Sequence, residues 1–99
     1  MFKNRMRPVH PGEILREDFL VPLHISGSAL AKSLNVPSAR INDILRERRS
    51  VTADTAMRLA RYFGGDARSW LNLQAAYDLR VAEIRHAKRI KREIAPAAA

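Results

Sequence analysis

Residues 38–49 contain several side chains that can hydrogen-bond to the edges of DNA bases. Arg40 can form a bidentate pair with guanine, and Asn42 can form one with adenine. Each such pair contributes about 1–3 kcal/mol of discrimination against the wrong base. The full set that we predict to contact bases is Ser38, Ala39, Arg40, Asn42 and Asp43. Taken in isolation, Arg40 would be better interpreted as a solvated surface arginine, so the hypothesis depends on the helix that carries it.

Neighbouring residues suit contacts with the DNA backbone. Arginines at the end of such a helix and in the loop after it usually bind phosphate rather than base edges. The free backbone N–H groups at the start of the preceding helix offer a further phosphate site, because the helix dipole favours anions there. The residues predicted to contact phosphate are therefore Gly27, Ser28, Arg46, Arg48 and Arg49. Glu47 lies among these arginines, and its pairing with one of them is the alternative.

Two short helices joined by a turn are expected to position these groups. Ser26 is a suitable N-cap for the first helix, and Asn35 tolerates the left-handed conformation that ends it. Pro37 prevents continuation and favours the start of the second helix, expected over residues 38–46. Ala31 is the small residue at which the helices touch, and the apolar residues that lock their crossing are Leu30, Leu34, Val36, Ile41 and Ile44. This spacing is typical of a helix-turn-helix motif, whose second helix enters the major groove; an ordinary helical hairpin is the alternative.

The rest of the chain also predicts helices, so the expected fold class is all-α, with five helices of which the last is long. The first helix starts at Pro11 and is expected to stop before Pro22. The fourth has Thr52 as its cap and Gly64-Gly65 as its end, and it buries Ala56, Leu59, Ala60 and Phe63. Asp66 then caps the fifth helix. No run shows the two-residue alternation of a half-buried strand.

The predicted helices divide the chain into three segments. Residues 1–10 are expected to form an extended arm, residues 11–84 a helix-turn-helix DNA-binding domain, and residues 85–99 a basic helix end with a frayed tail. The last segment carries a basic cluster, made of Arg85, Lys88, Arg89, Lys91 and Arg92. This cluster is most simply a solvated face, and contact with the DNA backbone is the alternative.

The composition favours a nucleic-acid partner and argues against catalysis. The 99 residues suit one domain, and 18 Lys and Arg against 10 Asp and Glu leave a net charge of +8, which attracts nucleic acid or an acidic membrane face. The chain has no Cys, which excludes disulfides and thiolate metal sites. His10, His24 and His86 lack the spacing of metal ligands, and no base accompanies Ser26. We therefore expect a protein that is not an enzyme and needs no metal or cofactor.

The sequence contains no signal for a membrane. No apolar stretch approaches the roughly 20 residues of a membrane span. The basic residues 1–8 are not followed by the apolar run of a signal peptide. The expected location is therefore the cytoplasm, with no membrane partner.

The fifth helix is the candidate dimer element. Repressors of this design pair two modules across half-sites roughly 34 Å apart. Apolar residues recur along this helix at steps of three and four, a spacing that suits packing against a second copy. The residues predicted for the dimer interface are Trp70, Leu73, Tyr77, Val81 and Ile84. For Trp70, burial in the core of its own domain is the alternative.

Five stretches of the sequence resemble the HigA antitoxins, a branch of the Xre/Cro-type, lambda-repressor-like helix-turn-helix repressors. They are HPGEIL at 10–15, LNVP at 34–37, RRSVTADTA at 48–56, LARYFG at 59–64 and WLNLQAAYDL at 70–79. The resemblance implies a homodimer that binds a palindromic operator in its own promoter and represses its own operon. It also implies a protein partner, a HigB-like toxin that cleaves messenger RNA.

An acidic patch near the start of the chain is the candidate toxin contact. HigB-like toxins are usually basic, and the patch consists of Glu13, Glu17 and Asp18. The alternative is that these acids only balance Arg16 and the helix dipole. A stand-alone Xre-type repressor without a toxin partner is the second interpretation of the whole chain.

Overall fold

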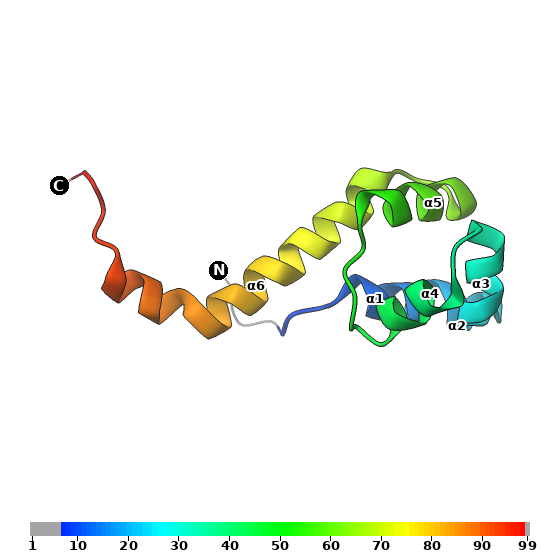
Figure 1. Cartoon of the computed structure of the whole chain (residues 1–99), viewed down its shortest axis with the longest axis horizontal. Helices are drawn as coiled ribbons and strands as arrows, with labels where there is room; N and C mark the ends of the chain where they lie inside the picture. The colour runs from blue at the N-terminus through cyan, green and yellow to red at the C-terminus, as the bar shows by residue number, and fades with distance from the viewer. Residues whose placement is uncertain (1–6, 99) are drawn as a thin grey trace.

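All regular structure in the described part of the chain is helical (Figure 1). A computed structural model describes residues 7–98; the first six residues of the predicted arm, and Ala99, lie outside the described residues. The elements are α1 (Pro11–Ile14), the π-helical η2 (Leu15–Leu20), α2 (Val21–Leu23), α3 (Gly27–Leu34), α4 (Ser38–Leu45), α5 (Ala53–Phe63) and α6 (Ala67–Glu93). Because α1, η2 and α2 follow one another without a break, they form one continuous helix. The prediction of an all-α fold with five helices and a long last one is confirmed.

The local signals for the central helix pair act as the sequence predicts. The Ser26 hydroxyl accepts a hydrogen bond from the Ala29 N–H at 3.0 Å and caps α3. Asn35 ends α3 in the left-handed conformation, with φ 58°. Pro37, in extended conformation, is the residue before α4. The motif that was predicted from spacing is therefore formed by α3 and α4.

The first helix departs from the prediction that it stops before Pro22. It continues through Pro22 to Leu23 and ends where His24 adopts a left-handed conformation, with φ 56°. A proline inside a regular α-helix clashes with the carbonyl group four residues earlier. Here the preceding turn is π-helical, and the Val21 N–H bonds to the Arg16 carbonyl five residues earlier. The wider turn gives the proline ring room, so Pro22 does not break the helix.

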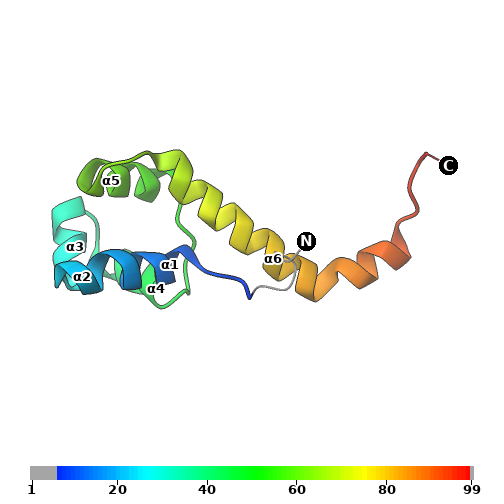
Figure 2. The same cartoon turned by 180° about the vertical axis from the view of Figure 1, so that it is seen from behind.

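The helix α5 begins and ends at the predicted residues, and α6 begins at its predicted cap. The Thr52 hydroxyl accepts a hydrogen bond from the Thr55 N–H, and the Asp66 carboxylate accepts one from the Ser69 N–H at 2.8 Å. Gly64 and Gly65 separate the helices with φ of 91° and 84°, which favours glycine. The C-terminal part of α6 extends away from the other helices in both views (Figures 1 and 2), and the chain measures 54 × 23 × 23 Å.

The core lies between the first helix (α1, η2 and α2), α3, α4, α5 and the first turns of α6. Its buried apolar residues are Leu15, Leu20, Leu30, Ala31, Leu34, Ile41, Ile44, Val51, Ala56, Leu59 and Trp70. Of the row predicted for α5, Ala56 and Leu59 are buried, whereas Ala60 and Phe63 are only partly buried. Phe19 of η2 packs against the end of α5 and the start of α6, with its ring centroid 4.8 Å from that of Phe63 and 5.4 Å from that of Trp70.

Two buried polar side chains fix the positions of chain segments. The His10 Nδ1 accepts a hydrogen bond from the Gly12 N–H at 2.8 Å and so caps α1. The Gln74 Oε1 accepts one from the Val51 N–H at 2.8 Å, which ties the loop after α4 to α6. A side chain at Gly12 would collide with the Ile44 carbonyl oxygen, so glycine permits close approach of α1 to α4. The position of α4 is thus determined by its close contact with α1 and by the hydrogen bond that ties the following loop to α6.

Within residues 7–98, none of the helices combines the length and apolar character that a membrane crossing requires.

Candidate nucleic-acid interface

The N-terminal end of α4 is open to solvent. Ile41 and Ile44 are fully buried and hold one side of α4 against the core. Ser38 and Ala39 are exposed on the other side, where their small side chains allow a close approach. This is the arrangement that a helix needs in order to lie in the major groove.

Arg40 is held by a neighbouring helix. Its Nη1 lies 2.6 Å from the Asp54 Oδ2 on α5. The Arg58 Nε lies 2.9 Å from the same oxygen, and the Arg58 Nη1 donates to the Leu34 carbonyl at the end of α3, also at 2.9 Å. The hydrogen bonds from Arg58 and Arg40 hold the pKa of Asp54 below its usual value of 3.8. The carboxylate therefore stays charged at neutral pH between the two arginines.

Asn42 lies against the start of α3 rather than projecting freely. A Cβ atom at Gly27 would lie 2.5 Å from the Asn42 Oδ1 and 2.8 Å from the Leu45 Cδ1. Gly27 and Asn42 are both half-buried, whereas Ser28 is exposed. The start of α3 and the exposed side of α4 therefore form one continuous surface, which places the predicted phosphate site beside the predicted base contacts.

The loop after α4 presents exposed arginines. Arg46, Arg48 and Arg49 are all exposed. Arg49 lies 3.5 Å from the Asp43 carboxylate. Glu47 does not pair with these arginines; it has φ 63° and lies 3.7 Å from Arg16 of the first helix. The loop therefore places three positive charges beside α4, of which the one on Arg49 is paired with Asp43.

A hollow of 310 Å³ lies beside α4, and two charged residues in its lining were not among the predicted site residues. The residues around it are Arg40, Arg49, Ser50, Thr52, Asp54, Thr55 and Arg58. These two charged residues are Asp54 and Arg58. Their spacing of four residues on one helix was a usable signal for an ion pair, but the link to Arg40 depends on how α4 and α5 pack.

The predicted dimer residues differ in exposure. Trp70 is only 5% exposed and contacts Phe19, so its side chain belongs to the core of the domain. Leu73, Tyr77 and Val81 are half-buried, and Ile84 is 58% exposed. The remaining seam on α6 therefore consists of Leu73, Tyr77, Val81 and Ile84, of which Ile84 is exposed.

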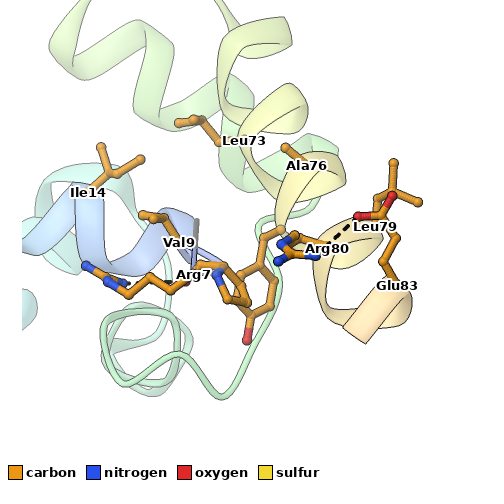
Figure 3. A pocket seen from close by; sticks show the side chains of 10 residues that line it. Arg7, Val9, Ile14, Leu73, Ala76, Leu79, Arg80 and Glu83 are labelled. Carbon is orange, nitrogen blue, oxygen red and sulfur yellow. Dashed lines mark hydrogen bonds and ion pairs between the residues drawn. The ribbon is translucent and has the colours of Figure 1, made fainter. Parts of the chain in front are cut away.

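An apolar pocket lies between α6 and the segment that leads into α1 (Figure 3). Its volume is 340 Å³, and its apolar lining includes Val9, Ile14, Leu73, Tyr77 and Leu79. Arg80 and Glu83, 3.7 Å apart, lie at its α6 side. Two of the predicted dimer residues, Leu73 and Tyr77, thus line a hollow apolar surface.

The predicted toxin-contact residues are partly engaged within the chain. Glu13 forms two hydrogen bonds with Arg7, at 2.7 and 2.8 Å, which lower the pKa of its carboxyl. Glu17 lies 2.9 Å from the Arg16 Nε. Asp18 is exposed on the same helix. The pairing of Glu17 with Arg16 is the one that the alternative interpretation expected.

Comparisons with known proteins agree with this geometry. The Helix-turn-helix family matches residues 15–70. Virulence-associated protein I of Dichelobacter nodosus is 64% identical over 81 residues, which are 82% of this chain and 75% of that protein. Antitoxin HigA-1 of Vibrio cholerae is 37% identical over 79 residues, which are 80% of this chain and 74% of that protein.

A solved structure has nearly the same fold. The Pseudomonas aeruginosa antitoxin HigA, solved with the higBA promoter, has a TM-score of 0.89 and 49% identity, covering 92% of this chain and 99% of that one. Fold and surface define a helix-turn-helix protein of the Xre type. The chain belongs to the helix-turn-helix family, and its structural neighbours there are HigA antitoxins, as the sequence resemblance implied. This family comprises DNA-binding antitoxins and regulators rather than enzymes.

Proposed function

We propose that this chain is an antitoxin that represses its own operon and neutralises a HigB-like toxin. The observation that carries the DNA-binding part is the exposed N-terminal side of α4, flanked by positive charge and held firmly by its buried side. The likeness to a HigA antitoxin solved with its promoter supports the same conclusion. A repressor of this kind acts in the cytoplasm, where its operator lies.

In this proposal α4 enters the major groove and the surrounding groups bind the backbone. The residues that face the bases are Ser38, Ala39, Arg40, Asn42 and Asp43. Phosphates are bound by Gly27, Ser28, Arg46, Arg48 and Arg49. Because Asn42 lies against Gly27, a phosphate at the start of α3 and a base at Asn42 are contacted by adjacent parts of one surface.

Two copies are needed to reach both halves of a palindromic operator. The seam on α6 that would join them consists of Leu73, Tyr77, Val81 and Ile84. Its support is the apolar surface that this seam presents together with the pocket beside Leu73 and Tyr77. Trp70 contributes to this interface only by supporting α6 from the core.

DNA binding is tested by titration of the purified chain into a duplex carrying its own upstream promoter region. A scrambled duplex of the same base composition is the control, at physiological salt. The affinity for a specific site should exceed the affinity for the scrambled duplex by a factor of about a thousand or more. Two copies of the chain should bind each palindrome. Equal, weak and salt-sensitive binding to both duplexes would contradict the proposal.

In this proposal the toxin binds near the start of the chain, where it contacts Glu13, Glu17 and Asp18. A stand-alone Xre-type repressor is the second candidate, because Glu13 and Glu17 already pair with arginines of this chain. The two are separated by an assay of messenger-RNA cleavage with the toxin encoded beside this gene, with and without the purified chain. Loss of cleavage supports the antitoxin; unchanged cleavage, or a locus without a toxin gene, supports the stand-alone repressor.

A further inference from the structure

A chain of hydrogen bonds connects three helices at the DNA-facing surface. The Leu34 carbonyl at the end of α3 accepts from Arg58, Arg58 donates to Asp54 on α5, and Asp54 accepts from Arg40 on α4. The Asp54 Oδ2 is shared by the two guanidinium groups. Arg58 therefore fixes the carboxylate, and the carboxylate fixes Arg40.

We propose that Asp54 is a specificity-determining residue, which presents the Arg40 guanidinium to a base and withholds it from phosphate. The inference rests on the proposed DNA binding through α4. It assigns to α5 a share in sequence recognition, although α5 does not itself enter the groove.

The guanidinium of Arg40 retains the donors that a base contact needs. An arginine has five N–H donors, and in the described structure only Nη1 of Arg40 is used, on Asp54. The groups at Nε and Nη2 can still pair with the O6 and N7 atoms of a guanine. Holding Arg40 before DNA arrives also reduces the side-chain entropy that is lost when the base pair is recognised.

The surroundings explain why a carboxylate is needed at this place. Arg40, Arg49 and Arg58 line the same hollow, and Asp54 is its only carboxylate in the described structure. Arg49 is also paired with Asp43, 3.5 Å away. Without Asp54, Arg40 and Arg58 would both be available to phosphate, which gives affinity without sequence choice. The Asp54 carboxylate repels phosphate and pairs with both guanidinium groups, so this part of the surface favours a base contact.

The test compares Asp54→Asn with the unaltered chain on the promoter duplex and the scrambled duplex. Asparagine keeps the size of the side chain and removes its charge. We expect tighter binding to the scrambled duplex, weaker binding to the promoter duplex, and a ratio of the two affinities that falls about tenfold, the size of one lost base contact. Promoter duplexes changed at one base pair at a time should show that one position in each half-site has lost its preference.

Three further variants separate this effect from a general gain of positive charge. Glu93→Gln, near the end of α6, makes the same change in net charge far from α4, and should leave the ratio unchanged. In an Arg40→Ala background, Asp54→Asn should lower the ratio no further, because the side chain that Asp54 holds is absent. Arg58→Ala frees Asp54 without altering α4 and should lower the ratio in the same direction. Thermal unfolding of each variant shows that it is folded.

The outcomes distinguish this inference from the function on which it rests. If the unaltered chain does not prefer the promoter duplex, the proposed DNA recognition fails. If it does, and Asp54→Asn keeps the ratio and every base preference within about twofold, recognition stands and the role of Asp54 is wrong. An increase in promoter affinity with the ratio intact would show that Asp54 only competes with DNA for Arg40.

Discussion

The imidazole ring of His10 lies edge-on to the phenol ring of Tyr77, with 4.8 Å between the ring centroids. Through this contact the residue that caps α1 also packs against α6, so one side chain joins the beginning of the domain to its last helix. The same histidine is buried, and burial lowers its pKa below the usual 6.5. Its protonation state is therefore coupled to the stability of the fold.

Stability should fall as the pH decreases through the range in which His10 titrates. The folded state favours the neutral ring, because Nδ1 accepts the Gly12 N–H and the site is buried. The unfolded chain binds a proton below about pH 6.5, and the folded chain binds it only at lower pH, so the contribution is complete above 6.5 and is lost below it. The measurement is the free energy of unfolding in urea at pH 8 and at pH 5, with His10→Asn as control. Asparagine can cap a helix without titrating, so a pH dependence equal to that of the unaltered chain would contradict the prediction.

Replacement of Gln74 by leucine should destabilise the domain. The variant leaves the buried Val51 N–H without its acceptor, which costs about 1–3 kcal/mol. Chemical denaturation measures the difference. Asn72→Leu, at an exposed position on the same helix, is the matched control and should change the free energy of unfolding by no more than about 0.5 kcal/mol. Equal effects of the two substitutions would show that the hydrogen bond contributes nothing.

Replacement of Arg40 by alanine should weaken operator binding and relax one base position in each half-site. The expected loss is about 1–3 kcal/mol, the value of one bidentate pair. Binding to the scrambled duplex should change much less. Fluorescence anisotropy with the promoter duplex and its single-base variants measures both effects. If every base preference survives, Arg40 does not contact a base and α4 presents a different side to the groove.

Replacement of Arg48 by alanine should weaken binding to all duplexes alike. Arg48 lies exposed in the loop after α4, where a phosphate contact adds affinity without sequence choice. The slope of log affinity against log salt concentration should decrease in magnitude by about one. A salt titration on promoter and scrambled duplexes is the measurement. A loss confined to the promoter duplex would instead place Arg48 at a base.

Replacement of Ile84 by glutamate should weaken the dimer without unfolding the domain. Ile84 is 58% exposed in the single chain, so a charge there is tolerated until a second copy must cover it. Sedimentation velocity over a range of concentrations measures the dissociation. Ile94→Glu is the control, since Ile94 is 63% exposed and lies beyond the predicted seam. If both variants remain dimers, the two copies meet elsewhere.

The sequence by itself determined the features that depend on near neighbours in the chain. Ser26, Asn35 and Asp66 begin or end helices through contacts within three or four residues, and each acts where it was predicted to act. Pro22 is the exception, because its effect on the helix was offset by a π-helical turn that the pattern of residue types does not reveal. The apolar spacing also sufficed to predict the helix-turn-helix motif.

Only the tertiary structure decided which side chains meet across helices. Arg40 and Asp54 are 14 residues apart, Val51 and Gln74 are 23 apart, and no local pattern predicts either contact. The burial of Trp70 against Phe19 was likewise one of two alternatives until the helices were placed. The physical reason is that a cap needs only the backbone beside it, whereas a contact between helices depends on crossing angles set by the packing of the whole core.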